Sequence, residues 1–151
     1  MGNKAEVEIL FQPIRIGAIT LKNRIAMPPI GTGFIDGEGF PTQQMFDYIE
    51  ERAKGGAGLI TLEVAAIDPR GRLSSKTFRI DEDKYLPAVS RLAEIIKKHG
   101  AMAAMQVVHV GREAPSSLIG CQPVAPSPVP GRSGEIPIDY LSTQVEKRAS
   151  K

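Results

Sequence analysis

The sequence predicts an α/β fold built from βα units, and three observations predict it. Two apolar segments, 59–62 and 101–108, have the composition of buried strands, and each begins directly after a predicted helix. The turns from helix to strand span only a few residues. The connections from strand to helix are long each time. Short connections at one end of a sheet and long ones at the other are typical of a (β/α) barrel or a doubly wound parallel sheet, with function at the carboxyl ends of the strands.

Ahead of these units, residues 11–24 predict an amphipathic β-hairpin with its turn at Gly17. A hairpin in this place favours the barrel, because it can close the end where the strands begin. The first strand is expected at 25–27. It ends at Pro28 and Pro29, since prolines cannot donate to a central ladder.

Two helices follow from capping residues and apolar spacing. The first is expected to begin after Thr42 and to end at Gly55, and the second to begin near Pro87 and to end at Gly100. We therefore expect hairpin 11–24, βα units over 25–141 and the start of a third helix at 142–151. The predicted buried stripes are Met45, Tyr48, Ile49 and Ala53 in the first helix, and Leu86, Val89, Ala93 and Ile96 in the second.

Composition excludes several classes of protein. In 151 residues, 19 Lys and Arg stand against 17 Asp and Glu, a net charge of +2 with no basic run, so we expect no nucleic-acid partner. The apolar stretches are too short for a membrane span. The single cysteine, Cys121, cannot form an internal disulfide and favours a reducing, cytoplasmic location. One cysteine and two histidines predict no metal site.

Candidate functional residues lie just past the carboxyl ends of the predicted strands. Glycine there lets a flat ligand approach the freed backbone closely, and small side chains can pave a ligand face. The Gln106 amide suits the paired acceptor and N–H edge of a pyrimidine-like ring, and Arg112 can stabilise negative charge. The candidates are Pro28, Pro29, Gly31 and Thr32 after the first strand, Val64 and Ala65 after the second, and Gln106, His109 and Arg112 after the third.

Each candidate has a structural alternative. Gln106 could satisfy backbone groups at a strand end, His109 could be a hydrogen-bonded structural histidine, and Arg112 could form an ordinary loop ion pair. We interpret Glu63 as a residue that pins a neighbouring loop. The dinucleotide pattern G-x-G-x-x-G fails because position 36 is Asp, and neither a phosphate-binding G-x-x-x-x-G-K-[ST] loop nor a G-x-S-x-G elbow occurs. A Rossmann-type binder, a phosphoryl transferase and a serine hydrolase are therefore disfavoured.

Several separated motifs are similar to those of one family. They are L-F-x-P at 10–13, L-K-N-R-I-A-M-P-P at 21–29, G-R at 71–72, Q-V-V-H-V-G-R at 106–112 and V-A-P-S at 124–127. In this order, over residues 10 to 145, the chain resembles the Old Yellow Enzyme family of NAD(P)H:flavin oxidoreductases. It is nearer to the bacterial enoate and 2,4-dienoyl-CoA reductases than to the yeast enzymes.

The resemblance implies a (β/α)8 TIM barrel in which FMN takes hydride from NAD(P)H and passes it to the activated C=C bond of a small enone or enoate. Residues 1–151 would be an incomplete FMN-binding barrel domain: the N-terminal hairpin, three strands and two helices. By resemblance, the isoalloxazine contacts are Pro28, Pro29, Val64, Ala65 and Gln106, with His109 and Arg112 in the vicinity of flavin or substrate. Gly31 stands where relatives carry a Thr, Cys or His that tunes the flavin, with Thr32 as a candidate substitute.

The length of the chain is a departure from the family. Eight βα units need about 250 residues, and the family's substrate-binding His or His/Asn pair, proton-donating Tyr and phosphate loops come after the position of residue 151. The catalytic residues are therefore unknown. We expect a truncated chain, inactive alone, with bare sheet edges that could support a homo-oligomer. The alternatives are a non-catalytic half-barrel that pairs with itself or with a separately encoded second half, and a broken reading frame in which 144–151 is a scar.

Overall fold

The computed structural model describes residues 7–139, so the helix predicted at 142–151 lies outside the described residues. Its centre is a parallel sheet in which β4 pairs with all three other strands. Along one edge of β4 runs β6, while β3 and β5 share the other edge at its two ends. The strands are β3 (Ala26–Met27), β4 (Leu59–Ala66), β5 (Phe78–Arg79) and β6 (Met102–Val108). The predicted α/β class and parallel βα order are confirmed.

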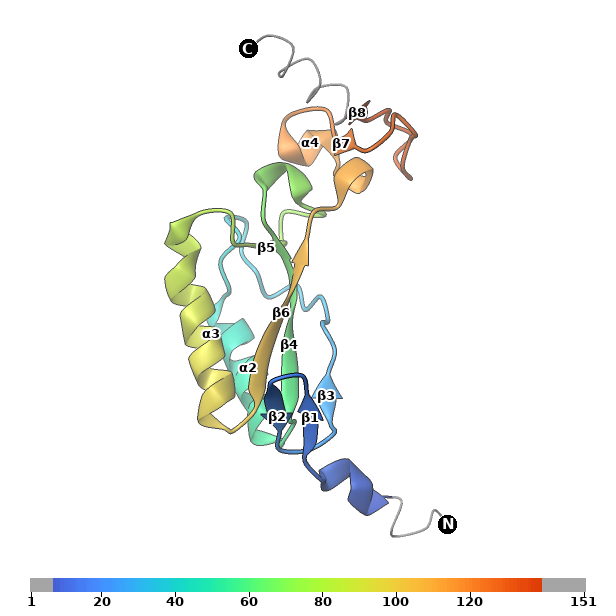
Figure 1. The fold of residues 1–151 in the computed structure, drawn as a ribbon. Coiled ribbons are helices and arrows are strands. Elements are labelled where there is room, and N and C mark those ends of the chain that lie inside the picture. Colours follow the sequence, from blue (N-terminus) through green and yellow to red (C-terminus); the bar gives the residue numbers. More distant parts are fainter. Residues whose placement is uncertain (1–6, 140–151) are drawn as a thin grey trace, which may run out of the picture.

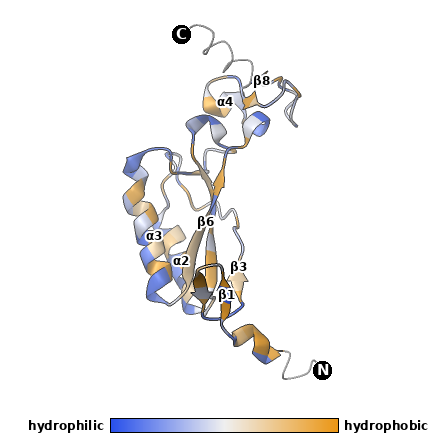
Figure 2. Cartoon of the chain, in the orientation of Figure 1, coloured by the Kyte–Doolittle hydropathy of each residue, from blue (hydrophilic) through white to orange (hydrophobic). Residues whose placement is uncertain are grey.

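Two helices, α2 (Gln43–Lys54) and α3 (Leu86–Lys98), lie side by side over one face of this sheet (Figure 1). Each helix is apolar toward the sheet and polar toward solvent (Figure 2), the pattern expected of helices that cover one face of a sheet. The buried side of α2 is formed by Met45, Phe46, Ile49 and Ala53, against Ile60 and Leu62 of β4. The stripe predicted for α2 is thus confirmed except at Tyr48, which is half-buried.

The stripe predicted for α3 is wrong at its first member, because Leu86 is 61% exposed. The fully buried residues are Leu92 and Ile96. A single 3-10 turn, η3 (Asp83–Tyr85), precedes α3 and places Tyr85 in the core instead, where it is 1% exposed. The Tyr85 hydroxyl donates to the Glu38 carbonyl at 3.0 Å, so its polar end is satisfied.

The predicted hairpin is confirmed as β1 (Ile14–Ile16) and β2 (Ile19–Leu21), paired antiparallel, after a 3-10 turn η1 (Ile9–Phe11). Gly17 adopts φ +57 at the turn, a conformation that favours glycine. The hairpin lies at the end of the sheet where β4 and β6 begin (Figure 1). Asn23, directly after it, donates to the Gly56 carbonyl at 2.7 Å and so ties the hairpin to the turn between α2 and β4.

At the other end of the sheet, short elements gather where β4 and β6 finish (Figure 1). They are η2 (Pro69–Gly71), η4 (Gly111–Glu113), α4 (Ser116–Ile119), β7 (Val124–Ala125) and β8 (Ile138–Asp139). β7 and β8 pair in parallel. The sequence predicted only a connection rich in Pro, Gly and Ser there. Within residues 7–139 the sheet does not close into a barrel.

A β-bulge interrupts the pairing of β4 with β6. Leu62 pairs with Met105 and Ala65 with Val107, so two residues of β4, Glu63 and Val64, stand opposite Gln106 alone. A bulge bends its strand and redirects the side chains around it, and bulges are common next to functional sites. This one lies among the predicted site residues.

Candidate functional site

A cavity of about 420 Å³ lies where the loop after β3, the bulge of β4 and the segment before β5 meet. Two of the predicted site residues, Gly31 and Val64, line it together. The segment before β5 forms one wall of the cavity, and no sequence motif predicted it. The complete lining is Gly31, Gly33, Glu63, Val64 and residues 73–77.

Glu63 holds the loop after β3 against the bulge. Its carboxylate is buried, and Oε1 accepts a 2.6 Å hydrogen bond from the Thr32 hydroxyl and a longer one, 3.4 Å, from the Thr32 N–H. The Thr32 Oγ1 also accepts from the Phe34 N–H at 3.1 Å. The interpretation of Glu63 as a loop-pinning residue is confirmed.

This geometry limits what Thr32 can offer a ligand. A threonine hydroxyl has one hydrogen, and Glu63 takes it. The Thr32 hydroxyl therefore has no hydrogen left to donate to a ligand. Gly31 itself leaves open space, since no atom lies within 4 Å of the place that a Cβ would occupy.

The bulge separates two residues that were expected on one ligand face. Ala65 is 0% exposed and packs in the apolar cluster with both helices, so the prediction that its side chain paves a ligand face is wrong. The extra residue in β4 returns Ala65 to the helix side, while Val64 stays on the cavity.

Gln106 lies on the face of β6 opposite to Met105, which packs toward the helices, because side chains alternate along a strand. Its side chain is exposed and makes no hydrogen bond with any described residue. The alternative in which Gln106 satisfies backbone groups at the strand end is therefore not observed. Both the donor and the acceptor of this amide remain available beside the bulge. The neighbouring Pro28 is exposed, and Pro29 is half-buried.

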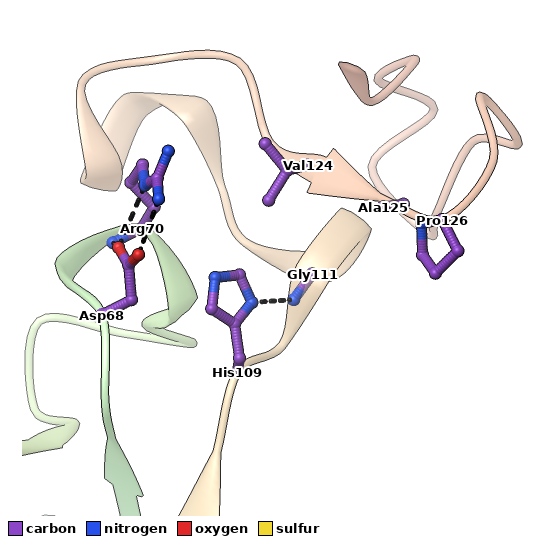
Figure 3. Close-up of a pocket in the computed structure, with 7 residues that line it drawn as sticks. All are labelled: Asp68, Arg70, His109, Gly111, Val124, Ala125 and Pro126. Carbon is purple, nitrogen blue, oxygen red and sulfur yellow. Dashed lines mark hydrogen bonds and ion pairs between the residues drawn. The ribbon is translucent and has the colours of Figure 1, made fainter. Parts of the chain in front are cut away.

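His109 lies in a different cavity, of about 390 Å³, beyond the end of β6 (Figure 3). Its Nδ1 accepts a hydrogen bond from the Gly111 N–H at 3.1 Å, as in the structural alternative for this residue. Gly71 is packed on the ring so closely that a Cβ there would lie 2.8 Å from the ring carbons. The histidine is thus held in one orientation at the edge of this second cavity.

Arg112 is exposed in η4, with Nε 3.7 Å from Glu113 Oε1, a loose surface pair of the kind foreseen as its alternative. It lines neither of these two cavities. Among residues 7–139 there is no group of three or more metal-ligating side chains. Over the same residues no helix has the length and apolar character needed to cross a bilayer.

The wall formed by 73–77 was not predicted from the sequence. Its shape comes from side-chain to backbone hydrogen bonds: the Ser74 N–H donates to Thr77 Oγ1 at 3.0 Å, and the Lys76 N–H donates to Ser74 Oγ at 3.2 Å. The run Ser-Ser-Lys-Thr carries this signal, because Ser and Thr favour such local turns. Nothing in the run indicates which cavity the turn closes.

A mixed α/β fold with its candidate site at the carboxyl ends of parallel strands is shared with enzymes of known structure. Residues 9–148 match the NADH:flavin oxidoreductase / NADH oxidase family. The chain therefore belongs to this family. Membership implies FMN as the cofactor and NAD(P)H as the reductant.

Curated relatives include an NADH oxidase from Thermoanaerobacter brockii, 44% identical over 123 residues, which are 80% of this chain and 19% of the relative. An NADPH dehydrogenase from Listeria monocytogenes serotype 4a is 36% identical over 122 residues, 80% of this chain and 35% of the relative. The chain thus spans between about a fifth and about a third of the length of these two proteins.

Solved structures with the same arrangement include an Old Yellow Enzyme from Pichia sp. AKU4542, with a TM-score of 0.80 and 27% identity over 94% of this chain and 40% of that one. An Old Yellow Enzyme homologue from Zymomonas mobilis has a TM-score of 0.75 and 33% identity, over 91% of this chain and 42% of its own. The likeness to Old Yellow Enzymes implied by the sequence motifs is confirmed.

Proposed function

We propose that this chain forms part of the flavin-binding side of an FMN-dependent NAD(P)H oxidoreductase of the ene-reductase type, acting on a small enone or enoate. Bound FMN would supply the hydride-transfer chemistry between NAD(P)H and an activated C=C bond. The observation that carries the proposal is the free amide of Gln106 opposite the bulge, on the strand next to the Gly31–Val64 cavity.

The residues present fit the ring of the cofactor. Gln106 has both a donor and an acceptor available, which a pyrimidine edge with alternating carbonyl and N–H groups requires. Open space at Gly31 allows the backbone after Pro28 and Pro29 to approach a flat ring, and Val64 offers an apolar contact from the bulge.

Other predicted residues have smaller roles in this proposal. Thr32 would contact the ring only through its backbone, because its hydroxyl serves Glu63. Ala65, which is 0% exposed, would support the bulge from the core without touching the ring. His109 and Arg112 would stay near the flavin without touching it. We place the chain in the cytoplasm, since its exposed Cys121 suits a reducing compartment.

The described residues do not offer a binding site for the phosphate of FMN. A phosphate needs several charge-assisted donors, and the cavity beside Gly31 has one cation in its lining, Lys76. We propose that the chain is a partial TIM barrel that binds the ring weakly and reduces no substrate alone. The small share of its relatives that it spans supports this.

The test compares FMN with riboflavin, which has the same ring and no phosphate, by fluorescence-quenching titration of the purified chain. We expect both to bind weakly and with dissociation constants within about twofold of each other, because the ring alone carries the contacts. Gln106→Ala should weaken both by about tenfold, since it removes two hydrogen bonds worth about 1.4 kcal/mol in total after solvation.

Gln44→Ala is the matched control, because Gln44 is exposed on α2 and makes no hydrogen bond with a described residue. It should bind as the wild type does. A phosphate-dependent preference for FMN, or equal binding by the Gln106 and Gln44 variants, would contradict the proposed ring-only site.

A second candidate function is a non-catalytic half-barrel that pairs with itself or with a separately encoded second half. Large apolar side chains exposed among the described residues favour it, notably Phe11, Ile67 and Val107, the last 57% exposed on β6. Unpaired sheet edges also promote association. Size-exclusion chromatography with light scattering decides the self-pairing form, and a folded monomer across the accessible concentrations would exclude it.

A further inference from the structure

The cavity around His109 has no part in the proposed flavin site, yet its lining has the composition of a small-molecule pocket. One side is apolar, formed by Val124, Ala125 and Pro126. The opposite side is polar, formed by His109 and by the ion pair of Asp68 and Arg70 (Figure 3). Pockets of 300 Å³ and above with apolar walls and a few oriented polar groups are the usual sites for small ligands.

His109 presents a hydrogen-bond donor to this cavity. Because Nδ1 accepts from the Gly111 N–H, the neutral ring carries its hydrogen on Nε2. No described residue accepts from Nε2. The close packing of Gly71 on the ring fixes its orientation, so the donor is held in place before any ligand arrives.

Asp68 presents an acceptor beside it. Its Oδ1 accepts from the Arg70 backbone N–H at 2.8 Å and from Nε at 3.0 Å, while Oδ2 accepts only from Nη2, at 2.7 Å. A carboxylate oxygen can accept two hydrogen bonds, so Oδ2 retains capacity for one more.

The charge of this wall selects against anions. Hydrogen bonds from Arg70 lower the pKa of Asp68 to about 2, so the carboxylate is ionised at neutral pH and Arg70 balances its charge. Asp68 and Arg70 together carry no net charge. An anion placed beside His109 would be repelled by the Asp68 carboxylate, whereas a neutral group would not.

We propose that this cavity binds a planar, neutral molecule that carries an amide, with His109 Nε2–H donating to the amide oxygen and the amide N–H donating to Asp68 Oδ2. The apolar body of the ligand lies against Val124 and Pro126. This site is independent of flavin binding, because neither His109 nor Asp68 lines the Gly31 cavity.

The chain has two histidines, which makes a direct test possible. In the full chain labelled with ¹⁵N-histidine, two-bond ¹H–¹⁵N spectra should show His109 with a protonated Nε2 and an unprotonated Nδ1. Titration with benzamide should shift the His109 nitrogens saturably. His99 is the internal control. It follows the last residue of α3 and contacts Glu50 of α2, so its signals should not move.

Benzoate, of the same size and shape but anionic, should bind at least about fivefold more weakly than benzamide. Asp68→Asn, which removes the charge, should reduce that preference, and His109→Phe should abolish binding while His99→Gln retains it. The proposal is overturned by no saturable shift at His109, by equal shifts at both histidines, or by benzoate binding as tightly as benzamide. The wild-type titration decides these outcomes even if a variant does not fold.

Discussion

The hydrogen bond between Thr32 and Glu63 should be one of the larger single contributions to the stability of the site. At 2.6 Å between the Thr32 hydroxyl and a carboxylate oxygen, it has the length of a charge-assisted O–H···O⁻ bond. Thr32→Val keeps the shape of the side chain and removes the hydroxyl. The Glu63 carboxylate, 4% exposed, then keeps only the 3.4 Å bond from the Thr32 N–H.

The expected cost follows from these contacts. Losing a hydrogen bond to a buried charged group costs about 1.5–3 kcal/mol, and the Phe34 N–H, which loses its Oγ1 acceptor, adds about 1 kcal/mol. We therefore expect Thr32→Val to lower the free energy of unfolding by about 2.5–4 kcal/mol. In urea unfolding followed by circular dichroism, the midpoint should fall by roughly 1–2 M.

Two further variants complete the experiment. Thr20→Val is the matched control, because Thr20 is exposed on β2 and its side chain makes no hydrogen bond with a described residue; it should change stability by less than about 0.5 kcal/mol. In a Glu63→Gln background, Thr32→Val should cost about 1 kcal/mol less than in the wild type, since the charge is gone. The same cost in both backgrounds, or a cost near that of Thr20→Val, would refute the assigned role of Glu63.

Two other predictions concern backbone packing and acid stability. Gly58→Ala should destabilise the chain by about 1–3 kcal/mol in the same urea assay, because its Cβ would lie 2.5 Å from Asn23 Oδ1. Gly37→Ala is the control, because Gly37 lies in open space and has no left-handed φ. It should be neutral or stabilising by about 0.5 kcal/mol. The pKa of Asp68 is lowered from 3.8 to about 2 by Arg70, so its contribution to stability is present above pH 4 and is lost as the pH falls through 2. The pair is partly exposed, which limits this contribution to about 1 kcal/mol, and the stability difference between wild type and Asp68→Asn should shrink over that pH range. A difference that stays constant between pH 7 and pH 2 would contradict this assignment.

The regular elements were predictable because their signals are local. Apolar spacing and the two flanking residues, Thr42 and Gly55, located α2, although the Thr42 hydroxyl donates to the Phe34 carbonyl and does not cap the helix. Gly17 located the hairpin turn. The failure at Leu86 arose because Tyr85, one residue earlier, reaches the core from a 3-10 turn, which apolar spacing alone does not reveal. The short elements α4, β7 and β8 were missed, because elements of two to four residues depend on contacts between distant segments.

The site was only partly predictable for the same reason. That Gly31 and Val64 share a cavity followed from the rule that strand ends meet at one edge of a parallel sheet. The bulge at Glu63 could not be foreseen, because it is a property of how β4 pairs with β6, and it alone sends Ala65 to the helix side. The roles of Gln106 and His109 toward ligands stay predictions for the titrations described above.

The two short strands on one edge of β4 have a consequence for how relatives can diverge. β3 engages Leu59 and Ile60, and β5 engages Ala65 and Ala66, so the edge between them carries no ladder that a neighbouring loop must preserve. Position 31 can therefore change its side chain without disturbing a backbone ladder, whereas Thr32, next to it, is held by its hydrogen bond with Glu63. A change at position 31 alone should alter the cavity and leave the pairing of the sheet as it is.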